Sequence, residues 1–484
     1  MERRFARSDA PLGYIARLAR QRWRSGSFPR RAGSSSASAT PSVQASDEKP
    51  TENPTPSRSP KPLPPLSVMP TRILLRSLMM TYILSSPRLV GLSIPIMHRI
   101  SYSKSWFLNP DRNPVLHGIV RRVFYDHFCA GENEAEVKKT MATMAKMGFE
   151  GVILGYARET LVEKSASPKD NVETSAADIA ERVVKEWKEG TLQTLAMLGP
   201  EDFLAVKLTG AGPAAIEAMT KREAPPPVLE AAITEICDQA SKQGTRLWID
   251  AEQQVFQHAI DTWTIDLMRK YNRDGRVLVY NTLQAYLKST PQNITRHLQL
   301  AQKEDWSLGI KLVRGAYITS EERALIHDTI EDTHACYNSI VRNLLSRTFP
   351  GVSQDVEFPH MQLFLASHNA ESVRSGYEIW RERNEKGLPT IKLEIGQLQG
   401  MADEVSCGLV QMRREMMAVG GNGSEKVWYP RAFKCLCWGK TQECIQFLVR
   451  RVVENRGSLD RTRFWLDGLK RELWRRMKTS IGLD

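Results

Sequence analysis

The chain has 484 residues, of which 41% are hydrophobic and 25% are charged, so it can bury a full core. This composition excludes a wholly disordered chain, a fibre and a small disulfide scaffold. The net charge is +12, but residues 1–70 hold twelve Lys or Arg against five Asp or Glu and contribute +7 of it. Because the remainder is only weakly basic, the composition makes no case for nucleic acid as a partner.

The first seventy residues differ in composition from the rest of the chain. Residues 1–40 contain nine Arg, a Ser/Ala run and only Glu2 and Asp9 as acids, which is typical of an organelle transit peptide. A merely basic tail is the alternative. Residues 41–70 contain nine Pro among Ser, Thr and Lys, and they predict a disordered linker.

A helical arm is predicted over residues 71–149. Apolar patches cover residues 73–100 but are interrupted by Arg76, Arg88 and Arg99, and the longest uncharged run, 77–87, is too short to span a bilayer. Such patches either pack in a core or lie on a membrane surface. Any membrane contact is therefore expected to be peripheral.

Short apolar runs with polar C-terminal ends recur after residue 150, separated by longer segments of helical spacing. Seven are clear, and a weaker eighth follows: 151–157, 203–210, 246–252, 276–286, 308–317, 361–369, 390–398 and 426–430. Strands that alternate with helices predict parallel βαβ units, and eight units favour a (βα)8 barrel over a doubly wound sheet. We expect the barrel over residues 150–470 and a C-terminal tail over 471–484.

Polar residues follow most of these runs. They are Lys207, Asp250, Glu252, Gln284, Lys311, Arg314, Tyr317, Ser367, His368 and Gln397. In a parallel barrel the carboxyl ends of all strands meet at one face, where the active site lies. The pattern therefore predicts a site at this face.

Two segments place cations near that face. Residues 311–317 (KLVRGAY) carry Lys311 and Arg314 next to small residues, which suits a phosphate, an electron-rich ring or a pair of structural ion pairs. Residues 445–457 form an amphipathic helix whose Arg450 and Arg451 can bind a carboxylate bidentately, unless they only form a solvated face.

Metal and disulfide signals are weak. The seven Cys are an odd number spread from Cys129 to Cys444, which favours reduced thiols in an intracellular compartment. Cys435, Cys437 and Cys444 cluster in the sequence without a second pair or a nearby His, so we predict no metal site.

Four motifs in order carry a family resemblance: KLVRGAY (311–317), ASHN (366–369), LEIGQLQGM (393–401) and LVRRVVEN (448–455). Together they resemble the proline dehydrogenases over roughly residues 85–470, and residues 438–444 (WGKTQEC) resemble the fungal mitochondrial branch. The resemblance implies an α/β fold, a distorted (βα)8 TIM-like barrel that binds FAD, with a final helix across the barrel mouth.

The resemblance also implies roles for individual residues. Lys207, Arg450 and Arg451 would bind the substrate carboxylate, Asp250 would orient Arg450, and Leu312 and Tyr317 would line the substrate ring. Glu159 loosely matches a gating acid. Several residues lie at positions similar to those that contact the flavin in the family: Gln284, Lys311, Val313, Arg314, Gly315, Ser367, His368, Asn369 and Gln397. Glu454 would also belong to the cofactor site, by bracing the last helix near the flavin ring.

These matches imply an FAD-dependent oxidation of L-proline to Δ1-pyrroline-5-carboxylate. Electrons would pass to a quinone at the matrix side of the mitochondrial inner membrane. The sequence departs from the family at Cys435. In the family a Tyr follows the Lys of an F-K-Y pattern at this position, whereas this chain has Phe433-Lys434-Cys435. Hydroxyproline-preferring relatives also lack this Tyr, so a hydroxyproline dehydrogenase is the close alternative. An inactive barrel that binds a small anion or a partner protein is the alternative from another class.

Overall fold

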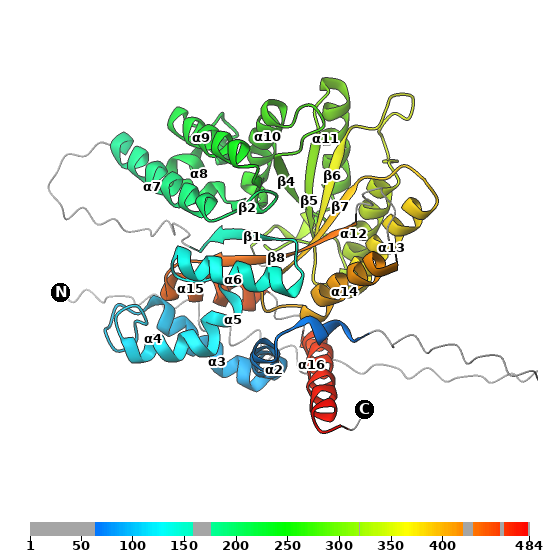
Figure 1. Ribbon diagram of the computed structural model, residues 1–484. Coiled ribbons are helices and arrows are strands. Elements are labelled where there is room, and N and C mark those ends of the chain that lie inside the picture. Colours follow the sequence, from blue (N-terminus) through cyan, green and yellow to red (C-terminus); the bar gives the residue numbers. More distant parts are fainter. Residues whose placement is uncertain (1–62, 158–175, 319, 420–428, 455–458, 483–484) are drawn as a thin grey trace, which may run out of the picture. The chain divides into compact units, whose positions relative to one another are not determined.

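The computed structural model describes residues 63–157, 176–318, 320–419, 429–454 and 459–482 (Figure 1). Eight parallel strands form a closed barrel in sequence order, each hydrogen-bonded to the next and β8 to β1. They are β1 (Gly151–Tyr156), β2 (Phe203–Val206), β3 (Arg246–Ile249), β4 (Val279–Gln284), β5 (Leu308–Val313), β6 (Met361–Ala366), β7 (Lys392–Leu398) and β8 (Arg431–Trp438). The prediction of a (βα)8 barrel is confirmed.

Successive side chains along each strand point alternately into and out of the barrel, and they form two separate apolar layers. Inside the barrel, aromatic side chains pack edge to face and form a closed floor: Phe203, Trp248, Tyr280, Phe364 and Phe433. Outside, aliphatic side chains of the strands pack against the helices in the largest core cluster. A ligand can therefore enter only above the floor, at one end of the barrel.

Helices follow the strands and cover the outside of the barrel (Figure 1). They are α7 (Ala176–Ala196), α8 (Pro213–Lys221), α9 (Pro227–Gln243), α10 (Gln254–Tyr271), α11 (Thr290–Glu304), α12 (Ile330–Leu345), α13 (Ala370–Glu385) and α14 (Asp403–Val419), with short 3-10 turns η3 (Leu208–Ala211) and η4 (Arg323–Leu325). Their starts follow local rules. Thr329 and Asp332 form a capping box at α12, and the Asn369 side chain caps α13.

The eighth strand corrects the sequence prediction, which placed it at residues 426–430. Residues 426–428 lie outside the described ranges, and Tyr429 and Pro430 precede the strand. The true strand contains Lys434, which breaks the apolar pattern that we used to find strands. Lys434 is 1% exposed and forms an ion pair of 2.8 Å with Asp403 of α14, so its charge is compensated outside the barrel.

The predicted arm is helical and packs against the barrel. It comprises α2 (Thr71–Ser85), α3 (Pro87–Tyr102), α4 (Pro114–Val120), the π-helix η2 (Arg121–Tyr125), α5 (Asp126–Phe128) and α6 (Glu134–Met147). Ser77 of α2 donates to Asp403 at 2.9 Å, and Tyr125 donates to the Gly439 carbonyl at 2.8 Å. The described residues from 63 onward thereby belong to one compact unit.

Two predicted boundaries need correction. The linker prediction extends too far, because residues 65–68 form the 3-10 turn η1 (Pro65–Val68) and Leu66 and Met69 are buried. Proline fits the first turn of such a helix, so a proline-rich stretch need not be extended. The predicted tail falls largely within α16 (Leu459–Ser480), which contacts α2. There Glu472 is buried between Arg475 and Arg476.

The last barrel helix is α15 (Thr441–Glu454), which packs beside α3 and reaches the barrel mouth. No helix in the described ranges combines the length and the apolar character that crossing a bilayer requires. The predicted transit peptide at residues 1–40 lies outside those ranges.

Candidate active site

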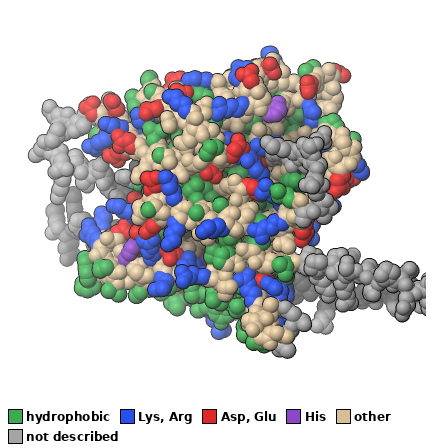
Figure 2. All heavy atoms as spheres, viewed as in Figure 1, with side chains coloured by type: hydrophobic (Ala, Val, Ile, Leu, Met, Phe, Trp, Pro, Cys, Tyr) green, Lys and Arg blue, Asp and Glu red, His purple; other side chains and the backbone are tan. Residues whose placement is uncertain are grey.

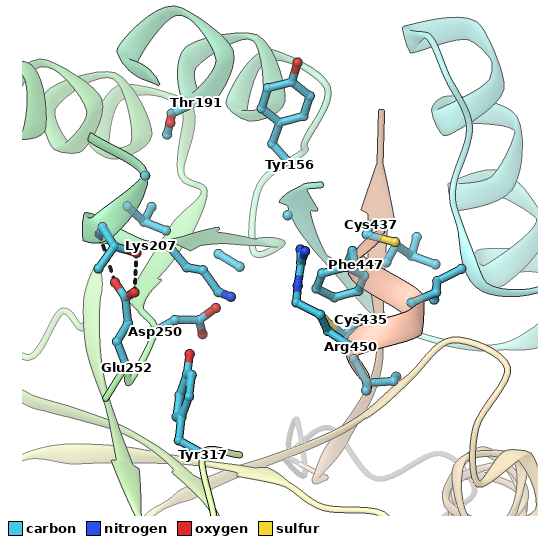
Figure 3. Close-up of a pocket in the computed structure, with 18 of the residues that line it drawn as sticks. Tyr156, Thr191, Lys207, Asp250, Glu252, Tyr317, Cys435, Cys437, Phe447 and Arg450 are labelled. Atoms are coloured by element: carbon cyan, nitrogen blue, oxygen red, sulfur yellow. Dashed lines mark hydrogen bonds between the residues drawn. The ribbon is translucent and has the colours of Figure 1, made fainter. Parts of the chain in front are cut away.

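A cavity of about 450 Å³ opens at the carboxyl ends of the strands, above the aromatic floor (Figure 3). Its wall comes from the ends of β1, β2, β3 and β8, from the loop after β5 and from α15. Such a volume suits a small molecule. The cavity thus lies at the face where the strand-end residues were expected to meet.

Four polar side chains face this cavity from different elements. Lys207 directly follows β2, Asp250 directly follows β3, Tyr317 lies after β5, and Arg450 lies on α15. Figure 3 shows the Lys207 ammonium, the Asp250 carboxylate and the Tyr317 hydroxyl on one side and the Arg450 guanidinium on the other. All four were predicted from the sequence, and the fold brings them to one cavity.

Asp250 has a partner that the sequence did not indicate. Its carboxylate forms an ion pair of 2.5 Å with the Lys311 ammonium, which lies 4.0 Å from the centroid of the Trp248 ring. Lys311 therefore lies between the aromatic floor and the carboxylate. This pair holds Asp250 at the edge of the cavity and places a third cation directly below it.

Glu252 and Thr209 were not assigned roles from the sequence, although Glu252 stood among the strand-end residues. Both line the cavity, where the backbone N–H of Thr209 donates to Glu252 at 3.0 Å and its hydroxyl donates to the second oxygen. Burial raises the pKa of Glu252, and the Thr209 hydrogen bonds and Lys207 oppose that rise. The signal that could have identified Thr209 is its position three residues after β2, in η3 at the same end of the barrel.

Cys435 and Phe447 form part of the opposite wall, beside Arg450 (Figure 3). Cys435 is half-buried in β8 and packs next to the aromatic floor. Phe447 precedes Arg450 by one helical turn on α15, and this i, i+3 spacing could have indicated that they share a face. The position at which the family has a Tyr, and this chain has Cys435, therefore lies on the cavity wall.

Two of the glutamines predicted to contact a flavin are buried at the strand ends. Gln284 donates to the Glu252 carbonyl at 3.1 Å and accepts from the Ala316 N–H at 3.2 Å. Gln397 donates to the Ser367 carbonyl at 3.2 Å, but its buried Oε1 has no hydrogen-bond partner among the residues that the structure describes. A buried amide oxygen without a donor is costly, so this atom fits the N–H of a bound ligand.

Arg314 and the start of α13 form a second polar group. The Arg314 guanidinium donates to Ser367 at 2.6 Å and to Ser372 at 2.7 Å, and it stacks 4.3 Å from the Tyr337 ring centroid. Asn369 caps α13 beside it. A helix N-terminus next to a guanidinium provides a positive potential that suits a phosphate group.

The remaining predicted flavin contacts lie nearby. His368 accepts from the Leu398 N–H at 3.2 Å, which fixes its ring at the end of β7. Val313 is half-buried on the same strand face as Lys311. Gly315 has φ +143°, and an added Cβ would collide with the Tyr286 ring, so packing alone requires glycine here.

The prediction for Leu312 is wrong. Leu312 is fully buried in the aliphatic layer outside the barrel, because alternation along β5 turns it away from Lys311. It therefore cannot line a ring in the cavity. The side chains of Arg451 and Glu454, and all of Glu159, lie outside the described residues.

Fold and cavity together define a (βα)8-barrel protein with a charged ligand site at the strand carboxyl ends. Residues 137–464 match the family described as proline dehydrogenase. "Proline dehydrogenase 1, mitochondrial" from Arabidopsis thaliana is 30% identical over 464 residues, which cover 86% of this chain and 85% of that protein. The chain belongs to the proline dehydrogenase family, as the motifs predicted.

A fungal relative agrees with this assignment, and a solved structure shares the fold. "Probable proline dehydrogenase, mitochondrial" from Schizosaccharomyces pombe is 28% identical over 456 residues, covering 83% of this chain and 88% of that protein. The structure of proline utilization A from Bdellovibrio bacteriovorus, inactivated by N-propargylglycine, superposes with a TM-score of 0.57 at 15% identity. The match covers 80% of this chain and 41% of that one, and because the identity is only 15% it supports the fold alone.

Proposed function

We propose that the protein is an FAD-dependent dehydrogenase that oxidises L-proline to Δ1-pyrroline-5-carboxylate. The observation that carries the proposal is the convergence of Lys207 and Arg450 on one cavity from opposite sides (Figure 3). Two cations on opposite walls can hold the carboxylate of an amino acid in a fixed position. Membership of the proline dehydrogenase family supports proline as that amino acid.

The cationic wall also affects the substrate amine. A proline amine must lose its proton before its lone pair can assist hydride loss from the adjacent ring carbon. Positive groups near an ammonium lower its pKa, so Lys207 and Arg450 favour the neutral amine in the bound state. Asp250 and Lys311 compensate each other as an ion pair, so together they add little net charge to this field.

FAD, when bound, would supply the redox chemistry by accepting the hydride. The residues present fit it in two places. The unpartnered Oε1 of Gln397 would accept from a ring N–H, while Arg314 and the α13 N-terminus would hold the pyrophosphate. Of the other positions matched to flavin contacts, we assign Gln284, Lys311, Val313, Gly315, Ser367, His368 and Asn369 to the same cofactor.

The flavin absorbance of the purified protein tests this function. We expect the protein to bind FAD and the bound flavin to be bleached anaerobically by L-proline, with loss of bleaching in Lys207→Met. A matched control, Lys242→Met, changes a lysine at the C-terminal end of α9 and should bleach like the wild type. Protein that binds no FAD, or holoprotein that neither proline nor hydroxyproline bleaches, would support the inactive-barrel alternative instead.

Cys435 favours a second substrate. Replacing the family Tyr by Cys removes a ring from the cavity wall, so trans-4-hydroxyproline gains room for its hydroxyl. We infer that hydroxyproline is oxidised at least as efficiently as proline. A kcat/KM much higher for proline than for trans-4-hydroxyproline would contradict this inference.

We further propose that the protein works on the matrix side of the mitochondrial inner membrane and passes electrons to a quinone there. The mitochondrial names of its relatives and the Arg-rich residues 1–40 support this location. Apolar side chains gather along the edge formed by α2, α3 and α4 (Figure 2), which supports contact with a lipid surface. We also propose the domain organisation predicted from the sequence: a transit peptide, a linker, a helical arm and the barrel. Its linker ends before η1, and α16 replaces most of the predicted C-terminal tail.

A further inference from the structure

Three thiols meet beside the cavity, and the sequence grouped only two of them, Cys437 and Cys444. Cys129 lies between α5 and α6, Cys437 in β8 and Cys444 in α15, and their Sγ atoms all lie within 4.8 Å of one another. The Cys129 and Cys437 sulfurs are 3.5 Å apart. All three residues are at most 7% exposed. Cys435, two residues before Cys437 in β8, packs against the aromatic floor and is not part of this group.

The backbone fixes this arrangement independently of the thiols. The Ala130 N–H donates to the Cys437 carbonyl at 2.7 Å, and the Gly439 N–H donates to the Gly131 carbonyl at 3.2 Å. Tyr125 adds its hydrogen bond to the Gly439 carbonyl. Three segments, two of them about 300 residues apart in the sequence, therefore present one sulfur each at a preorganised point.

The spacing of the sulfurs matches one metal ion better than a disulfide. Zn–S bonds of about 2.3 Å in tetrahedral geometry place ligand sulfurs roughly 3.8 Å apart, which is compatible with this cluster. A disulfide would need an S–S distance of about 2.05 Å, and it would leave the third sulfur without a role. The convergence of three sulfurs therefore favours an ion.

We propose that Cys129, Cys437 and Cys444 form a three-thiolate site for a thiophilic divalent ion of the Zn²⁺ class. On binding, each thiol releases its proton to solvent and its sulfur coordinates the ion, with no change of redox state. An oxygen is available for the fourth position, since Gly439 and Tyr125 border the cluster. Met80, Phe128 and Leu448 pack around it and keep bulk water out.

The site has a structural consequence for the cavity. Cys444 lies on α15, the helix that carries Arg450, and Cys437 lies both in the cluster and on the cavity wall. An ion would connect α15 to β8 and to the arm. The inference concerns the ion alone and does not depend on the substrate or on FAD.

Metal uptake by the reduced full-length protein tests the site. After removal of metals with a chelator, we expect one equivalent of Zn²⁺ to bind, and Co²⁺ to give a thiolate-to-metal charge-transfer band in the wild type. Cys129→Ser and Cys444→Ser should each weaken Zn²⁺ binding by roughly 100-fold or more, because a lost ligand costs at least as much as a lost supporting residue. Cys237→Ser, a buried thiol on α9, is the matched control and should bind Zn²⁺ normally.

A second measurement covers variants that fold poorly. Zn²⁺ should raise the thermal midpoint of the wild type and of Cys237→Ser, but not that of the double variant Cys129→Ser/Cys444→Ser. The proposal is overturned if the reduced wild type takes up no Zn²⁺, or if the variants bind it as tightly as the control does. A Cys129–Cys437 disulfide in the freshly isolated protein, found by peptide mapping after alkylation, would also overturn it.

Discussion

Arg450 and Lys207 approach the cavity from opposite walls, so each should contribute separately to carboxylate binding. We predict that Arg450→Met raises the KM for proline by at least about thirtyfold, which corresponds to about 2 kcal/mol for a lost charge contact. The kcat should fall less, because the lost contact is made with bound substrate as well as with the transition state. Steady-state kinetics checks this, with Arg342→Met on the exposed face of α12 as control. An unchanged KM would remove Arg450 from the carboxylate site.

The wall position of Cys435 gives a specificity prediction. Cys435→Tyr restores the family residue and refills the space, so hydroxyproline should lose efficiency relative to proline. We expect the ratio of the two kcat/KM values to shift by about tenfold or more towards proline, as is typical for steric changes in a pocket. Cys435→Ala leaves the space open and should keep the wild-type ratio. If Cys435→Tyr binds FAD normally yet keeps that ratio, this position does not determine specificity.

At the residue scale, the sequence predicted the cavity wall well and its supports poorly. Lys207, Asp250 and Tyr317 reach the cavity because parallel strand ends meet at one face, a rule that sequence position alone can use. Arg450 on α15 and Cys435 within β8 also line the cavity, but their roles came from the family motifs. To predict the Lys311–Asp250 ion pair, one must know where β3 and β5 lie relative to each other. Local sequence does not contain that position.

Elements were predictable where their apolar pattern was unbroken. Strand β8 was misplaced because it contains Lys434, and a buried cation inside a strand is rare. Only the fold shows that Asp403 of α14 compensates the charge of Lys434. The same network continues to His127 of α5, whose ring bonds to the Gly400 carbonyl at 3.2 Å. Gly400 has φ +74°, and an added Cβ would lie 2.7 Å from that ring. The arm is therefore held to the barrel by a tightly packed polar junction.

This junction predicts a loss of stability in acid. Burial lowers the pKa of His127 to about 4, from 6.5, although Asp403 and the Gly400 carbonyl partly oppose that shift and Arg76 and Lys434 reinforce it. Between these two values the folded protein binds fewer protons than the unfolded chain, so the free energy of unfolding falls as the pH drops from 6.5 through 4. The loss amounts to on the order of 3 kcal/mol.

Urea unfolding at pH 7 and pH 4.5 checks this prediction. His127→Gln should lose less stability between the two values than the wild type does, because its side chain does not titrate. His258→Gln changes an exposed histidine on α10 and should behave like the wild type. An equal acid loss in wild type and His127→Gln would show that other groups dominate.

For the whole molecule, the sequence predicted the barrel and the arm but not which elements the arm contacts. α2 contacts α16, α3 packs beside α15, and the segment after α5 bonds to β8. These contacts join residues hundreds of positions apart, and local periodicity carries no information about such pairs. The arm exposes a set of large apolar side chains, which we call the arm face: Leu75, Met79, Tyr82, Leu89, Leu92, Ile96, Trp106, Phe107, Val115 and Ile119.

The arm face should bind anionic membranes. Arg88 and Arg99 are exposed on α3 and Arg112 is exposed before α4, so both apolar burial and charge favour a negatively charged lipid surface. We predict co-sedimentation with phosphatidylcholine/phosphatidylglycerol vesicles, weaker at high salt because of screening. Leu92→Glu/Ile96→Glu should weaken binding by at least about tenfold, since each buried aliphatic side chain contributes about 1.5–3 kcal/mol. Val228→Glu, an equally apolar exposed position on α9, should bind like the wild type. Equal binding by the double variant and Val228→Glu would place membrane contact elsewhere on the protein.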